Sequence, residues 1–342
     1  MSRLLLAAAL MAAPLCAEPL KVGDPVAEFA PNNWLIPPVY GAFEDLKGDV
    51  ILFYAWNKDS EAAVKQLPAL NTLAAKPGMH VVSLYTGVHK FADLEALVAQ
   101  HKIAYPIALD SFWPAGYDAP KVPKAWVVGT DGTVKFIGES GFEKTLDEEL
   151  AKVKFPGLGR DKMAKGVEAA AKLYAQGKFG EAHAEAQKVA DATEDKAEEA
   201  DADWLVKRIE AQLKALLTRA DTCENDRDFV RAMRCWEAIA KYAPLEDAAQ
   251  GAERLKKLAE NPAVSKEITA RRNLIALNYD RAVERRKIDA KDTAKLRKFY
   301  EASLAAYKKF AQDNKDTAAA DRAQEQVARY EASIQELDDA GK

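Results

Sequence analysis

Cysteine is scarce in this chain of 342 residues, which contains three. They are Cys16, Cys223 and Cys235, so the long stretch from Ala17 to Thr222 has none. Thiol-disulfide chemistry needs a thiolate that attacks and usually a second thiol that resolves the product. The stretch between Cys16 and Cys223 therefore has no thiol with which to carry out such a reaction.

Histidine is also rare, and the sequence lacks the common motifs of cofactor chemistry. The four histidines, His80, His89, His101 and His183, have no cysteine or carboxylate neighbours at the spacing of metal ligands. Neither a glycine-rich phosphate loop nor a Gly-x-Ser-x-Gly motif occurs. We therefore expect neither a metal site nor an organic cofactor.

Charge of one sign does not accumulate along the chain. The 49 basic and 53 acidic residues are interspersed and give a net charge of -4. Nucleic-acid binding usually requires a basic patch or an arginine-rich run, and the sequence has neither. The chain is also too long for one ordinary hydrophobic core, so two or more domains are expected.

The N-terminus has the pattern of an export signal. The segment "MSRLLLAAALMAAPLCAEPL" has one early positive charge, a short apolar run and small residues before Glu18. We expect residues 1–17 to be a signal peptide cleaved after Ala17, which predicts a periplasmic or secreted protein. Lipidation of Cys16 is an alternative, although Leu15 stands where a small residue would be wanted. No later segment is long and apolar enough to predict a transmembrane helix.

Residues 18–153 alternate between strand-like and helix-like patterns. Continuous apolar runs of strand length, such as "DVILFYAW" and "MHVVSLYT", are followed by segments with helical spacing. The runs "KAWVVGT" and "TVKFIGES" flank Asp131-Gly132, a strong hairpin signal. This order predicts an α/β domain, with a central mixed sheet covered by helices on both faces.

Residues 154–160, "KFPGLGR", interrupt this alternation and predict a linker between domains. Beyond it the helical period persists almost to the end, which predicts an all-α region. The segment "ENPAVS" divides that region into residues 161–260 and 261–342. Helices are expected near 161–176, 179–192, 196–224, 228–242, 246–259, 265–287, 291–313 and 317–337.

Two segments of the helical region resemble tetratricopeptide hairpins. Gly177, Phe179 and Ala182 have the small-x-aromatic-x-x-Ala spacing of such a hairpin, and "RDFVRAMRCWEAIAKYAP" repeats the theme. In the second segment the corresponding residues are Phe229, Ala232, Trp236 and Pro244. The two matches lie farther apart than the period of a regular array, about 34 residues. We therefore expect tetratricopeptide-like hairpins and not a tandem array.

Cys223 and Cys235 flank the turn predicted in the second of these hairpins. In an oxidising compartment, two thiols on facing helices are suited to a structural disulfide. A redox role for the pair, or two buried thiols that never bond, are the alternatives.

Residues 19 to about 153 resemble the thioredoxin-like redoxins of the bacterial envelope, the TlpA-like and AhpC/TSA group. The matching segments are "KVGDPVAEF", "FEDLKGDVILFYAW", "SEAAVKQLPAL" and "YPIALD" followed by "VPKAWVVGTDGTVKFIGES". The resemblance implies a thioredoxin-like fold in which Pro123 is a cis-proline facing the active-site turn. It also implies an apolar groove that receives an extended peptide, with the backbone of Val122 available to pair with it.

The resemblance fails at the reactive positions. Asn57 and Ser60 stand where the family has its two cysteines. An amide cannot take part in thiol exchange, and a serine hydroxyl is a poor nucleophile without a base beside it. Ser60 is better suited to cap the following helix, where Asp59 favours the positive end of the helix dipole.

These observations predict an exported, redox-inactive thioredoxin-like protein that binds a protein or peptide partner or acts as a scaffold. Trp56, Trp113, Val122 and Pro123 are the candidate residues of the groove. One alternative is an unconventional thiol-disulfide oxidoreductase that uses the two late cysteines. Another is an architectural role, in which Trp113 fills the groove and the helices alone bind.

Overall fold

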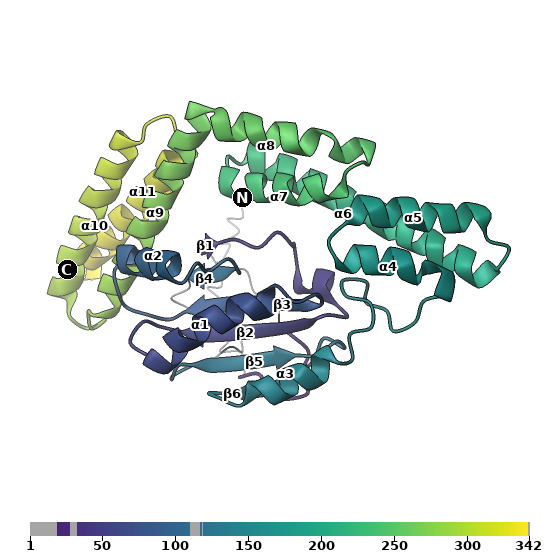
Figure 1. Ribbon diagram of the computed structural model, residues 1–342. Helices are drawn as coiled ribbons and strands as arrows, with labels where there is room; N and C mark the ends of the chain where they lie inside the picture. Colours follow the sequence, from purple (N-terminus) through teal and green to yellow (C-terminus); the bar gives the residue numbers. More distant parts are fainter. Residues whose placement is uncertain (1–18, 28–32, 110–116, 118, 341–342) are drawn as a thin grey trace, which may run out of the picture.

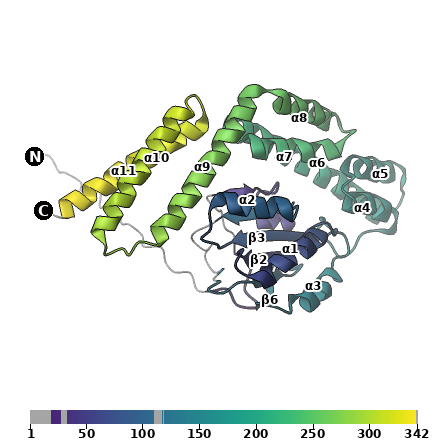
Figure 2. The ribbon, with the colours of Figure 1, turned by 60° about the vertical axis from the view of Figure 1, so that its left-hand side comes forward.

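The computed structural model describes residues 19–27, 33–109, 117 and 119–340. The predicted signal peptide with Cys16, and Trp113, lie outside the described residues. An α/β domain is followed by an all-helical region that arches over it (Figures 1 and 2). The predicted fold class is therefore confirmed.

The α/β domain is built on a mixed sheet of six strands in the order β1-β4-β3-β2-β5-β6. Strands β2, β3 and β4 are parallel neighbours, and β1, β5 and β6 pair antiparallel. The strands are β1 (Trp34–Ile36), β2 (Val50–Trp56), β3 (Met79–Tyr85), β4 (Ile107–Leu109), β5 (Lys124–Val128) and β6 (Val134–Gly138). Five of them coincide with the apolar runs of the sequence, whereas β1 was not predicted.

The helices of this domain follow the strands as predicted, but they gather on one face. α1 (Glu61–Ala74), α2 (Phe91–Gln100) and α3 (Phe142–Leu150) all contribute to the core that contains Leu52 and Tyr54 of β2. The opposite face is covered by the 3-10 helix η1 (Phe43–Leu46), N-terminal segments and Tyr117. Among the described residues no α-helix of this domain covers that face, so the prediction of helices on both faces is wrong except for the short η1. Both crossovers, β2-α1-β3 and β3-α2-β4, run in the same direction across the sheet, and right-handed connections then place both helices on the same side.

The helical region begins at η2 (Lys165–Val167) and matches the sequence prediction closely. Its α-helices are α4 (Glu168–Ala175), α5 (Phe179–Ala192), α6 (Lys196–Asn225), α7 (Phe229–Ile239), α8 (Gln250–Glu260), α9 (Pro262–Arg286), α10 (Thr293–Asp313) and α11 (Ala318–Ala340). The short 3-10 helices η3 (Ala240–Tyr242) and η4 (Glu246–Ala248) lie between α7 and α8. Asn261 caps α9 and Pro262 occupies its first turn, so the break at "ENPAVS" is a direct step from one helix to the next. No helix among the described residues is both long and apolar enough to cross a membrane.

Small and aromatic residues join the helical hairpins. The ring of Phe179 stacks on Tyr242 at a centroid distance of 4.6 Å. A Cβ atom added to Gly180 would lie 2.0 Å from the carbonyl oxygen of Ala243, so only glycine permits this approach. Ala182 and Ala232 are fully buried. These contacts show packed antiparallel hairpins, while their kinship to tetratricopeptide repeats stays a prediction.

The helical region contacts the α/β domain in two places, near residues 154–160 and at α9. Near the expected linker, the amide of Gly157 donates to Asp49 Oδ1 at 2.7 Å, and the hydroxyl of Tyr174 donates to the carbonyl of Gly157 at 3.3 Å. At the far end, Tyr279 and Val283 of α9 join the core of the α/β domain. Residues 154–160 therefore form an ordered connection. The helical region packs against the α/β domain both near this connection and at α9.

Candidate functional site: the cysteine-free turn and its cavity

The turn between β2 and α1 keeps its shape through an amide and a hydroxyl. Asn57 Oδ1 accepts hydrogen bonds from the backbone amides of Asp59 at 3.1 Å and Ser60 at 3.0 Å. Ser60 Oγ accepts from the amide of Ala63 at 3.2 Å, which caps α1. Asn57 and Ser60 thus satisfy backbone donors that the helix start would otherwise leave open.

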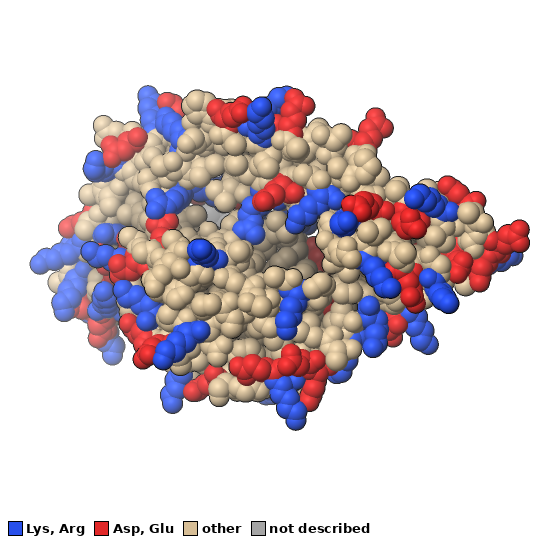
Figure 3. All heavy atoms as spheres, viewed as in Figure 1, with Lys and Arg blue, Asp and Glu red and all other residues tan. Residues whose placement is uncertain are grey.

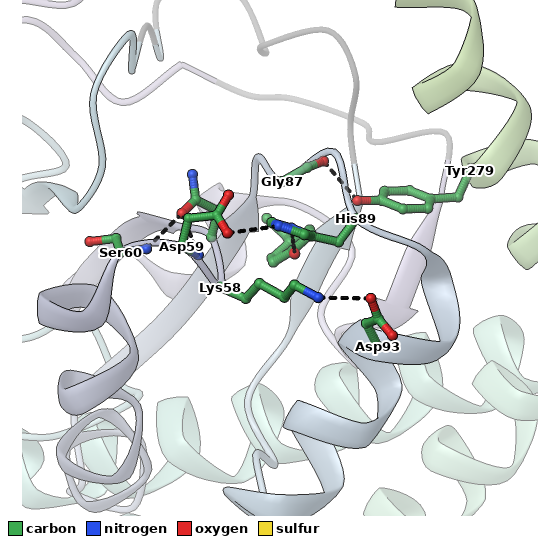
Figure 4. Close-up of polar contacts among 9 residues, drawn as sticks. Lys58, Asp59, Ser60, Gly87, His89, Asp93 and Tyr279 are labelled. Carbon is green, nitrogen blue, oxygen red and sulfur yellow. Dashed lines mark hydrogen bonds and ion pairs between the residues drawn. The ribbon is translucent and has the colours of Figure 1, made fainter.

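A chain of polar contacts connects this turn to the loop after β3 (Figure 4). Asp59 Oδ1 lies 2.9 Å from His89 Nε2, and His89 Nδ1 lies 3.0 Å from the hydroxyl of Tyr85. Burial raises the pKa of Tyr85 above its usual range. Because the imidazole is engaged at both nitrogens and Ser60 Oγ already caps α1, this arrangement does not make Ser60 an activated nucleophile.

The loop that carries His89 is in turn held by the helical region. The hydroxyl of Tyr279 in α9 donates to the carbonyl oxygen of Gly87 at 2.8 Å (Figure 4). Beside it, Lys58 Nζ pairs with Asp93 Oδ2 at 2.7 Å, and the hydrogen bond from Lys58 holds the pKa of Asp93 below its usual value. The helices therefore support the turn through its neighbouring loop.

Trp56 was predicted to line the peptide groove, but it does not line the cavity beside the turn. Its side chain has no exposed surface, and its ring meets that of Tyr85 edge to face at a centroid distance of 4.8 Å. Trp56 is the last residue of β2, and it faces the core beneath α1 together with Val50, Leu52 and Tyr54, two residues apart along the strand. Its role here is in packing.

A cavity of about 550 Å³ opens beside the turn. Asn57, Ser60 and Val122 are among the residues that line it. The peptide bond between Val122 and Pro123 is cis, as the resemblance implied. Neither the amide nor the carbonyl of Val122 has a hydrogen-bond partner among the described residues. The structure thus brings together three of the residues singled out from the sequence.

Other cavity residues were not singled out from the sequence. Thr86, Lys121 and Glu139 also line this space. Thr86 directly follows β3, and its amide donates to the carbonyl of Trp56 at 2.9 Å. Residues at the carboxyl ends of neighbouring parallel strands meet at one edge of a sheet. The location of Thr86 beside the turn after β2 could therefore have been predicted from the sequence.

The two late cysteines lie elsewhere. Cys223 of α6 and Cys235 of α7 are buried free thiols. The interaction between the two thiols, together with burial, raises the pKa of Cys223, and the same interaction lowers the pKa of Cys235. Neither residue lines the cavity beside the turn. In the described part of the chain, no group of three or more potential ligands is placed to hold a metal ion.

A parallel β2-β3-β4 unit, a turn and helix after β2, and a cis-proline before an antiparallel hairpin give the N-terminal domain a thioredoxin-like fold. No family model and no curated protein matches the chain.

Solved structures that match include a thioredoxin-like superfamily protein, SPOA0173, at 20% identity and a TM-score of 0.33, covering 38% of this chain and 95% of that one. A thiol-disulfide isomerase from Corynebacterium glutamicum matches at 15% identity and a TM-score of 0.33, covering 37% and 96%. A thioredoxin-like protein in the oxidized form matches at 20% identity and a TM-score of 0.33, covering 41% and 99%.

Proposed function

We propose that this chain is an exported protein whose thioredoxin-like domain binds an extended protein or peptide segment without thiol chemistry. The helical region is its scaffold. The observation that carries the proposal is that the backbone of Val122 has no hydrogen-bond partner among the described residues and lines the same cavity as the turn at Asn57. An extended segment can pair with such backbone groups in the manner of an added strand.

The turn favours binding over reaction because its polar groups are already engaged. Asn57 and Ser60 stabilise the start of α1, and Asp59 is held by His89. Because the turn is held in place before a partner binds, it loses little conformational entropy on binding. Asn57, Asp59 and Ser60 are therefore not arranged as an activated nucleophile.

The buried cysteine pair argues against the oxidoreductase alternative. Cys235 has no exposed surface, and Cys223 is 7% exposed. Thiol exchange requires that a thiolate reach the substrate disulfide. Both sulfurs would have to leave the interior of the α6–α7 hairpin before they met a substrate.

The proposal is tested with reduced, carboxymethylated α-lactalbumin as a permanently extended probe, its binding followed by fluorescence anisotropy. Val122→Pro removes the backbone donor, whereas the matched control Val122→Ala keeps it and removes only side-chain volume. Thr86→Trp fills the cavity without touching that backbone. We expect Val122→Pro to weaken binding by about fivefold, since one lost hydrogen bond contributes about 1 kcal/mol. Thr86→Trp should weaken binding at least as much, because its side chain occupies the space of the bound segment.

The control variant should bind within about twofold of the unmodified protein, a difference far below 1.4 kcal/mol. Circular dichroism confirms that each variant is folded. Absence of binding, or equal binding by all four proteins, would contradict the proposal and leave the architectural role, with the helices alone as the binding part.

A further inference from the structure

A second and larger cavity lies between the α/β domain and the far end of the helical region. It has a volume of about 710 Å³ and is lined by residues of β1, α2, α7, α9, α10 and α11. Figure 3 shows that the molecular surface is hollowed between the helices and the sheet domain, with basic side chains near the openings. We refer to this second space as the arginine cavity.

The lining of the arginine cavity is strongly basic. It contains seven arginines and three carboxylates, Glu95, Asp228 and Glu325. Four of the arginines come from one face of α9, and the others from α7 and α11. The chain as a whole is slightly acidic, with a net charge of -4. The lining of the arginine cavity is therefore positively charged, although the chain as a whole has a net negative charge.

Part of this charge is neutralised by ion pairs. Arg271 pairs with Asp228 at 2.7 Å, and Arg272 donates to both carboxylate oxygens of Glu95 at 2.5 Å. These contacts employ two of the three carboxylates of the lining. They also fix α9 against α7 and α2 and so define two walls of the cavity.

Three arginines of the lining remain without a partner. The guanidinium groups of Arg231, Arg322 and Arg329 make no hydrogen bond or ion pair within the described part of the chain. Arg281 pairs with Glu284 at 3.0 Å, but its Nε is buried and has no acceptor. A buried donor without an acceptor is costly unless a ligand supplies one.

The unpaired arginines lie close to other positive groups. Burial lowers the pKa of Arg271, and the charges of Arg322 and Arg231 lower it further. Like charges held near one another in a hollow create a positive potential that attracts anions. Guanidinium groups offer paired N–H donors that match carboxylate and phosphate oxygens.

From this arrangement we infer that the arginine cavity binds a small polyanion that carries phosphate or carboxylate groups. Its volume falls within the range of small-molecule sites, about 300–1,000 Å³. Arg322 and Arg329 of α11 and Arg231 of α7 contact the anionic groups. The cavity shares no lining residue with the space beside the Asn57 turn, so this inference is independent of peptide binding.

Isothermal titration calorimetry of the whole chain at constant ionic strength tests the inference. Pyrophosphate and citrate are the probes for the phosphate and the carboxylate form of the ligand. The test variant is Arg322→Ala with Arg329→Ala, two exposed residues without partners, so folding should be preserved. Arg286→Ala is the matched control, because this exposed arginine of α9 does not line the cavity.

We expect at least one probe to bind the unmodified protein, and the double variant to bind it more weakly by about tenfold or more, because two charged hydrogen-bond donors are removed. Arg231→Ala, on a different helix, should weaken the same probe. The Arg286→Ala protein should bind as the unmodified one does. Binding of neither probe, or equal affinity in the double variant and the control, would overturn the inference.

Discussion

Thiol exchange needs a thiol and access to the substrate. The turn at residues 57–60 and the α6–α7 hairpin each provide one of these two. The turn has access, because it lines a cavity beside the cis-peptide bond at Val122–Pro123. The hairpin has two thiols, but Cys223 and Cys235 are buried. The comparison teaches that a thioredoxin-like frame does not depend on its cysteines for shape.

Capping explains how the turn keeps its shape without cysteine. Asn57 and Ser60 accept the backbone amides at the start of α1, and these groups need acceptors whatever chemistry the turn performs. The apolar runs of β2 and β3 and their pairing with β5 then fix the strand that enters the turn. The scaffold and the reaction are therefore separable properties of this fold.

Introducing two cysteines at the turn should have the largest effect. Asn57→Cys with Ser60→Cys places a Cys-x-x-Cys motif at a helix start, where thiolates are stabilised. We expect this variant to accelerate the reduction of insulin by dithiothreitol by at least about tenfold over the unmodified protein, because a thiolate at this position gains both access and a resolving partner. The single variant Asn57→Cys, which lacks that partner, should show no comparable gain. A double variant that is folded but inactive would mean that the frame has lost more than its sulfurs.

Oxidation of the late cysteines should stabilise the helical region. We predict that Cys223 and Cys235 form a disulfide in an oxidising compartment and that it contributes about 2–4 kcal/mol to the free energy of unfolding. Urea unfolding with and without dithiothreitol measures this difference. Cys223→Ala with Cys235→Ala should remove the dependence on dithiothreitol. An unmodified protein that is equally stable in both conditions would show that the thiols stay unpaired.

Removing the amide at the turn should have a smaller effect. Asn57→Ala leaves the amides of Asp59 and Ser60 without their acceptor, and we expect a loss of about 1 kcal/mol in the free energy of unfolding. Asn57→Asp retains an acceptor at the same position and should recover most of this loss. Thermal or urea unfolding of the three proteins provides the measurement, and equal stability of all three would refute the capping role.

The smallest effect is expected at the ion pair between Lys58 and Asp93. The pKa of Asp93 lies below its ordinary value of 3.8, so the pair stabilises the folded state above that pH and loses its contribution as the pH falls through the lowered pKa. Lys58→Ala should return the pKa of Asp93 to its ordinary range in an NMR titration. Lys65→Ala, which removes a pair with Glu61, should leave it unchanged. An unaltered Asp93 in Lys58→Ala would show that the pair is not formed in solution.

Long periodic elements were predictable from the sequence because burial alone determines them. The apolar run of β2 and the long helices from α5 to α11 coincide with the predicted segments. β1 was missed because its three residues carry too little pattern to reveal an edge strand. Which face of the sheet a helix covers depends on the direction of the crossovers, and the order of elements alone does not give it.

The candidate site was predictable only in part. The roles of Ser60 and Pro123 follow from local rules about caps and from the resemblance, whereas the burial of Trp56 depends on the packing of Tyr85 against it. The arginine cavity was invisible because its residues are spread over α7, α9 and α11. A search for basic runs along the chain cannot find charges that only the fold brings together.

The most direct test of the central claim is the rate at which the unmodified protein accelerates insulin reduction by dithiothreitol. We expect the rate of dithiothreitol alone, both for the unmodified protein and for Cys223→Ser with Cys235→Ser. Clear acceleration that disappears in the double serine variant would contradict it, and the buried pair in the helices would then be the reactive site.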